Sequence, residues 1–204
     1  MERICAIFSH YRRISLTEMC LQKLAQQTVP PHRVVVADNG AGDGSLDGVK
    51  EQAAAGAYPF MLEIIDMPGN TGNAGGIARG LERAFSFPDV DAVWILDDDS
   101  WPEPDALACL LSHGPGTDGM EWPCVRGCKV VDLKQGGELS WPMVLLDEKD
   151  GRRIHVTRGD ALPEAPFLLT GGAFLGALVP REIHDKVRGP TAGLFIRGED
   201  EEYP

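Results

Sequence analysis

The first half of the chain alternates between short apolar runs and segments with helical periodicity, and this alternation limits the folds open to it. The apolar runs cover residues 4–8, 34–37, 60–65 and 92–96. We expect the segments between them to form helices, the last of which is entered through a glycine-rich loop. Strands and helices that alternate at this spacing predict an α/β fold with a doubly wound, mostly parallel central sheet.

The first expected helix carries a specific local signal. Ser15-Leu16-Thr17-Glu18 has the form of a capping box, in which Ser and Glu side chains bond the free amides at the start of a helix. Leu16, Met19, Cys20 and Leu24 follow at helical spacing. We therefore expect the helix to begin at the capping box and to present these four side chains on one face.

The composition of the chain changes after a further expected helix, which begins near Asp105. Residues from about 114 to 166 are rich in Gly, Pro and charged side chains. Short strand candidates at 124–131 and 143–146 predict an extra hairpin region there. We interpret it as a small insertion in a single domain that covers residues 1–204.

The earlier pattern resumes at residues 167–178. A helix over 180–187 and a strand over 194–197 are expected to follow. The chain then stops directly after the acidic cluster of residues 199–202. We interpret this end as that of an excised fragment.

The composition of the chain excludes some classes of binding partner and indicates a cellular location. The formal net charge of -12 argues against nucleic acid, whose phosphates favour a basic face, and against simple electrostatic docking on anionic lipid. An acidic protein that handles an anionic substrate needs local Arg or Lys residues or a bound cation. Five cysteines at irregular spacing are typical of reduced thiols in a cytosolic protein. With no signal peptide and no bilayer-length apolar stretch, we expect a cytoplasmic location.

Three consecutive carboxylates, Asp97-Asp98-Asp99, follow the apolar run of residues 92–96. Adjacent like charges repel and gain nothing from burial, so a buried strand rarely ends in them by accident. Asp97 and Asp99, as alternate carboxylates at an exposed strand end, can share a hard divalent cation such as Mn²⁺ or Mg²⁺, which in turn clamps a diphosphate. Taken alone, the triplet is equally consistent with a solvated acidic turn before the next helix.

Polar residues at the other strand ends favour the cation site. Ser9, Asp38 and Asn70 follow the first three apolar runs, as the triplet follows the fourth. Doubly wound sheets bind their ligands outside the carboxyl ends of the strands. We therefore expect these residues to meet at one edge of the sheet.

The glycine-rich run from Gly69 to Gly80 is the second strong signal. Its glycines allow backbone N–H groups to approach a ligand, and the helix that follows points its positive end at anions. Asn73 and Arg79 could add side-chain donors to a diphosphate or a sugar. The alternative is a tight contact between a helix and the sheet, with Arg79 on the surface. The run has neither the Walker nor the dinucleotide-binding glycine spacing.

Together these blocks resemble the family 2 glycosyltransferases of the GT-A fold, and within them bacterial galactofuranosyl- and rhamnosyltransferase-type enzymes. The matching stretches are the following: Ser9-His10-Tyr11-Arg12, Ala37-Asp38-Asn39, the run from Asn70 to Gly80, Asp97-Asp98-Asp99 and Gly198-Glu199-Asp200-Glu201. They occur in this order over nearly the whole chain.

The resemblance implies a role for each matched position. Ser9, Asp38, Asn70, Asn73 and Arg79 would line the pocket of a nucleoside-diphosphate sugar such as UDP-galactofuranose or dTDP-rhamnose. Asp97 and Asp98 would contact this donor, and Asp97 and Asp99 its Mn²⁺ or Mg²⁺. Asp200 would be the general base that deprotonates a glycan or lipid-linked acceptor, with inversion at the anomeric carbon.

The resemblance also implies parts that this chain does not contain. Related enzymes carry a metal-binding His and acceptor-site helices beyond the acidic pair, so the fragment is expected to bind donor weakly and to lack turnover. A peripheral association with the inner face of the membrane through that missing region stays open. Two alternatives also stay open, a sugar-phosphate nucleotidyltransferase and a nucleotide-sugar-binding module without catalysis.

Overall fold

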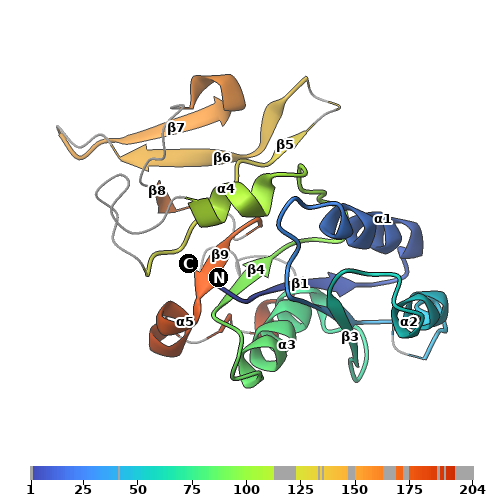
Figure 1. Cartoon of the computed structure of the whole chain (residues 1–204). Helices are drawn as coiled ribbons and strands as arrows, with labels where there is room; N and C mark the ends of the chain where they lie inside the picture. Colours follow the sequence, from blue (N-terminus) through green and yellow to red (C-terminus); the bar gives the residue numbers. More distant parts are fainter. Residues whose placement is uncertain are drawn as a thin grey trace.

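The computed structural model describes residues 2–40, 42–112, 123–132, 134, 136–146, 150–162, 169–171, 175–187, 189–190 and 192–195. Five strands form a central sheet in the order β3-β2-β1-β4-β9 (Figure 1). Their bounds are β1 Ile4–His10, β2 Arg33–Asp38, β3 Met61–Asp66, β4 Ala92–Ile95 and β9 Leu178–Pro180. The first four pair in parallel and β9 pairs antiparallel to β4, which confirms the mostly parallel sheet.

Helices cover both faces of this sheet. Helices α1 (Ile14–Ala25), α2 (Asp47–Ala54) and α4 (Ala106–Ser112) contribute to the core on one face, and α3 (Gly72–Ser86) packs on the other. Strand β1 illustrates why the run of residues 4–8 is apolar at every position. Its alternate residues Ile4, Ala6 and Phe8 belong to the first core, while Cys5 and Ile7 belong to the second. A strand buried on both faces needs apolar side chains at every position.

The strand order creates a topological switch point beside β1. The chain leaves β1 toward β2 on one side, and later returns from α3 to β4 on the other. Connections that leave neighbouring strands in opposite directions open a crevice at the carboxyl ends of those strands. His10 ends β1, and Asp97 follows β4 by two residues, so the acidic triplet lies at this crevice.

The insertion forms a second, antiparallel sheet. It contains β5 (Val131–Asp132), β6 (Glu138–Leu146), β7 (Arg153–Arg158) and β8 (Leu169–Gly171). The candidate at 143–146 lies within β6, which forms a hairpin with β7, a strand that was not predicted from the sequence. The strand candidate at 124–131 is wrong for most of its length, because it contributes only a bridge at Arg126 and the first residue of β5. The single-domain division stays a prediction.

The predicted capping box is also wrong. Helix α1 begins at Ile14, its cap is Arg13, and no side chain bonds its first amides. The amides of Leu16 and Thr17 instead donate to the Arg13 carbonyl, at 3.0 and 3.1 Å. The buried face carries Thr17, Cys20, Leu21 and Leu24, whereas Met19 is 38 % exposed. The contacts of Arg13 with the acidic triplet, described below, give a physical reason for this earlier start.

Two features concern the end of the described chain. Helix α5 (Arg181–Val187) matches its predicted range, but residues 192–194 form a short 3₁₀ helix where a strand had been predicted to begin. Phe195 then adopts a left-handed conformation, with φ 65°, which interrupts extended structure. Within the described residues, no helix is long and apolar enough to cross a membrane.

Candidate functional site

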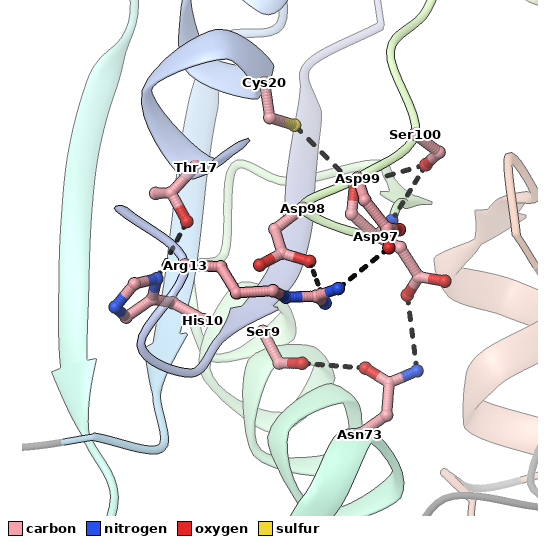
Figure 2. A network of polar contacts seen from close by, with 10 residues as sticks. All are labelled: Ser9, His10, Arg13, Thr17, Cys20, Asn73, Asp97, Asp98, Asp99 and Ser100. Atoms are coloured by element: carbon pink, nitrogen blue, oxygen red, sulfur yellow. Dashed lines mark hydrogen bonds and ion pairs between the residues drawn. The ribbon is translucent and has the colours of Figure 1, made fainter. Parts of the chain in front are cut away.

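The acidic triplet alternates in direction at the end of β4. Asp98 is 1 % exposed and its Oδ2 has no hydrogen-bond partner among the described residues, whereas half of the Asp99 side chain is exposed. Asp97 lies between these extremes and points toward α3 (Figure 2). Asp97 and Asp99 are therefore the two carboxylates of the triplet that an incoming ligand can reach.

Arg13 is the counter-charge of the triplet. Its Nη1 donates to Asp99 Oδ2 at 2.9 Å, and its Nη2 donates to Asp98 Oδ1. Figure 2 shows the guanidinium between the two carboxylates. Sequence reasoning missed Arg13, although a usable signal existed. That signal depends on the strand order: β1 and β4 are neighbours in the sheet, so a cation in the loop after β1 faces the carboxylates after β4.

A short relay joins three of the predicted site residues. The Ser9 hydroxyl donates to Asn73 Oδ1 at 2.7 Å, and Asn73 Nδ2 donates to Asp97 Oδ1 at 3.3 Å. The three residues come from the end of β1, the first turn of α3 and the end of β4. The structure thus brings Ser9, Asn73 and Asp97 together, and the relay orients the Asp97 carboxylate.

The electrostatics of the triplet follow from its burial. Burial raises the pKa of Asp97 to about 6, and the neighbouring charges of Asp99 and Asp98 act in the same direction. Burial also raises the pKa of Asp98 to about 6, against the opposing effect of Arg13. Both groups are ionised at neutral pH at a free-energy cost, and a positive ligand would offset that cost.

Asn39 and Asn70 hold the start of α3, and Asp38 bonds the turn that follows β2. Asp38 is buried and accepts a bond from the Gly40 amide at 2.9 Å, and Asn70 Oδ1 accepts one from the Gly72 amide at 3.0 Å. Buried Asn39, which was not among the predicted site residues, accepts from the Thr71 amide and hydroxyl and donates to the Gly72 carbonyl. Asp38 and Asn70 thus lie at the predicted sheet edge, with partners inside the protein.

Most of the glycine-rich run is helical, because α3 begins at Gly72; the predicted loop is wrong from that residue onward, and only residues 69–71 of the run precede the helix. A Cβ on Gly76 would lie 2.6 Å from Ser9 Cβ, so this glycine permits a close approach between α3 and β1. The amides of Thr71, Gly72 and Ala74 already bond Asn39, Asn70 and the Phe195 carbonyl. The start of α3 is consequently occupied by protein acceptors, which leaves the triplet as the better place for a diphosphate clamp.

Three other candidates stand apart from this group. Arg79 is on the exposed side of α3, paired with Glu82 at 2.5 Å, and no contact among the described residues links it to the triplet. His10 is buried between Thr17 and Ser45, at 2.8 and 3.0 Å, and burial lowers its pKa. His10 is thus a packing residue here. Asp200 lies outside the described residues.

The triplet fits a divalent cation in part. Its hard oxygen donors suit Mn²⁺ or Mg²⁺, and Asp98 Oδ2, for which the described part of the chain offers no hydrogen-bond partner, leaves negative charge uncompensated. No group of three His, Cys, Asp or Glu side chains in the described part of the chain forms a complete metal site. A cation held by Asp97 and Asp99 would therefore complete its shell with water or ligand oxygens, as Mg²⁺ usually does.

A pocket of about 170 Å³ lies elsewhere, where β2 and β3 begin, and Arg33, Glu63 and Phe87 are among its lining residues. It opens at the amino ends of the strands, opposite the crevice. The convergence of polar groups, and not this pocket, identifies the candidate site.

Comparison with known proteins places this geometry in a family. The model of glycosyl transferase family 2 matches residues 5–128, which include every part of the triplet, the relay and Arg13. The chain belongs to this family.

Its relatives include galactofuranosyltransferases named GlfT1. The protein from Mycolicibacterium smegmatis is 26 % identical over 208 residues, and that from Mycobacterium tuberculosis is 32 % identical over 207. Each alignment covers 98 % of this chain but only 64 % and 63 % of the relative. This family 2 chain thus spans a little under two thirds of the length of these relatives.

Solved structures show the same fold. The mannosyltransferase PcManGT from Pyrobaculum calidifontis, in complex with GDP-Man and Mn²⁺, superposes with a TM-score of 0.61 at 19 % identity. TarS 1-349 from S. aureus, in complex with UDP, gives a TM-score of 0.58 at 17 % identity. Both cover 98 % of this chain, which covers 50 % and 53 % of theirs. At such identities the likeness concerns the fold, and it confirms the expected GT-A architecture.

Proposed function

We propose that this family 2 chain is the donor-binding and catalytic domain of an inverting, metal-dependent glycosyltransferase. The observation that carries the proposal is the convergence of Asp97, Asp99 and the Ser9–Asn73 relay at the switch point of the sheet. Carboxylates at that position can hold a cation against the diphosphate of a nucleotide-sugar.

The donor that we propose is UDP-galactofuranose, because the sequence relatives are named galactofuranosyltransferases. A dTDP-rhamnose donor is the alternative within the same sugar-nucleotide class. The acceptor is a glycan or a lipid-linked sugar in cell-surface polysaccharide synthesis. The cytoplasmic location and a peripheral association with the membrane stay predictions from the sequence.

In this proposal, different residues of the chain bind the donor and transfer the proton of the acceptor. Asp97 and Asp99 would hold the cation, which when bound would supply positive charge to stabilise the departing diphosphate. Ser9 and Asn73 keep Asp97 oriented toward the crevice. Asp200 removes the proton of the acceptor hydroxyl. At the same time the hydroxyl oxygen forms a bond to the anomeric carbon, and the bond between that carbon and the diphosphate breaks. The attack occurs opposite the leaving group, so the anomeric configuration inverts.

Asp99→Asn tests the proposal at its centre. This variant should lose Mn²⁺-dependent binding of UDP in calorimetry, because it removes a charged ligand of the cation from an exposed position. Asp66→Asn is a matched control, since Asp66 is exposed at the end of β3 and pairs only loosely with Lys50 at 3.9 Å. UDP affinity that is equal in wild type and Asp99→Asn, with Mn²⁺ present, would remove the metal role.

The two alternatives predict different outcomes of a turnover assay. A nucleotidyltransferase would release pyrophosphate from a nucleoside triphosphate and a sugar phosphate. Such an enzyme is expected to have a glycine-rich loop after the first strand, whereas here that loop ends in Arg13 bonded to the triplet. A binding module without catalysis would bind the nucleotide-sugar and release no sugar to any acceptor.

A further inference from the structure

The triplet and Arg13 form an unbalanced charge cluster. Three carboxylates occupy consecutive positions, and among the described residues Arg13 is the cation that bonds two of them, Asp98 and Asp99. The loop after β1 thus supplies one positive charge at the place where the proposed function needs a divalent cation.

The two arms of Arg13 differ in their surroundings. Nη2 bonds Asp98, whose side chain is 1 % exposed, so this arm is tied to a buried group. Nη1 bonds Asp99, and both of these side chains are 50 % exposed. Removing one partner of a buried ion pair costs much stability, because the other charge stays buried without a partner. An exposed ion pair contributes little stability, and its partners exchange readily with solvent and ions. The Asp99 arm is therefore the one that a competing cation can displace.

We propose that Arg13 is an internal counter-ion of the metal site: it holds Asp99 in the metal-free protein and yields Asp99 to the divalent cation, while it stays bonded to Asp98. This inference rests on the proposed function, since it takes Asp99 as a metal ligand. Two positive groups on one carboxylate repel each other, so the cation and the guanidinium compete for Asp99. When no metal is bound, the guanidinium offsets the repulsion between the carboxylates. Its competition with the cation weakens metal binding.

The test measures Mn²⁺ alone, as free Mn²⁺ in electron paramagnetic resonance titrations of the chain at constant ionic strength. Arg13→Gln should bind Mn²⁺ about 3- to 10-fold more tightly than wild type, because it loses an exposed competing charge. A residue that merely supports the fold would give the opposite sign, since its loss disorders the ligands.

Arg12→Gln is the matched control. Arg12 is adjacent in sequence and carries the same charge, but its guanidinium lies 5.1 Å from the centre of the Tyr11 ring and has no bond to the triplet among the described contacts. Its removal should change Mn²⁺ affinity less than 2-fold. An increase equal to that of Arg13→Gln would show a general field effect and overturn the proposal.

A second pair of variants protects the test against misfolding, because Arg13→Gln leaves buried Asp98 without its cation. Asp98→Asn removes that charge, so Arg13→Gln/Asp98→Asn is compared with Asp98→Asn alone. Equal Mn²⁺ affinity in this pair overturns the proposal, and tighter binding by the double variant supports it. If Asp99→Asn binds Mn²⁺ as wild type does, the metal site itself is wrong. If Asp99→Asn loses binding while Arg13→Gln changes nothing, only the counter-ion role fails.

Discussion

At the scale of single residues, the acidic triplet combines a stability cost with a binding capacity. Burial raises the pKa of both Asp97 and Asp98 to about 6, so the folded protein resists their ionisation. Because the folded state binds these protons more tightly than the unfolded state, the free energy of unfolding falls as the pH rises from about 4 to about 6. The penalty is complete above that window.

Asp97→Asn should therefore stabilise the protein at neutral pH. The amide keeps an oxygen for the bond from Asn73 and removes a carboxylate whose ionisation is unfavourable in the fold. We expect the free energy of unfolding to rise by on the order of 2 kcal/mol at pH 7.5. The gain should shrink as the pH is lowered through 6 toward 4. Urea denaturation at several pH values measures it, and a gain that is independent of pH would contradict the assignment.

The sequence alone predicted only some of the residues of the candidate site. Ser9 and Asp97 were identified from their places at strand ends and Asn73 from the glycine-rich run, and the three residues meet in space. Arg13 was missed because its role depends on carboxylates 86 positions away along the chain. His10 shows the converse case, because a histidine at a promising strand end is bonded to Thr17 and Ser45 inside the core.

At the scale of elements, α3 connects the core to the site. Its buried residues Ile77, Leu81 and Ala84 pack on the sheet, while Asn73 in its first turn holds Asp97. Gly76 allows the helix to approach Ser9 closely. Small residues on this face therefore set the distance between the helix and the carboxyl end of β1.

Gly76→Ala and Gly48→Ala should have opposite effects on stability. Both glycines are within helices, but a Cβ at 76 meets Ser9 Cβ at 2.6 Å, whereas a Cβ at 48 has no atom within 4 Å. We expect Gly76→Ala to lower the free energy of unfolding by about 1–2 kcal/mol through overpacking. Gly48→Ala should raise it by about 0.5–1 kcal/mol through helix propensity. Chemical denaturation of the two variants compares them directly, and similar changes would argue against a tight contact at Ser9.

In the first half of the chain, the predicted elements and the observed ones differ mainly at helix starts. The strands at the four apolar runs were located within two residues at each end. Burial on both faces demands an apolar run in β1, β2 and β4, whereas β3 is only partly buried. The start of α1 was misplaced because the cap, Arg13, is held by a distant carboxylate pair instead of a local side chain. The start of α3 was misplaced because Asn39, from another strand end, bonds its first residues.

At the scale of the whole molecule, the proposed function assigns donor binding and proton transfer to different parts of the sequence. The proposed donor ligands are in the part of the chain matched by the family model, residues 5–128, and the proposed base lies far beyond it in sequence. Asp200→Asn should therefore leave Mn²⁺-dependent UDP binding intact and reduce sugar transfer by roughly 10²–10⁴-fold. A protein form with measurable transfer is needed for this comparison, and retained turnover would mean that another group is the base.

The amino-acid sequence by itself determined the alternation of strands and helices, the mostly parallel sheet and the presence of acidic and amide side chains at the strand ends. These properties depend on local periodicity and burial, which neighbouring residues specify. Only the tertiary structure decided that Arg13 bonds Asp98 and Asp99, that Asn73 joins Ser9 to Asp97 and that protein acceptors occupy the start of α3. Those contacts join residues distant in sequence, and the packing of β1 between β2 and β4 is what brings them within bonding distance.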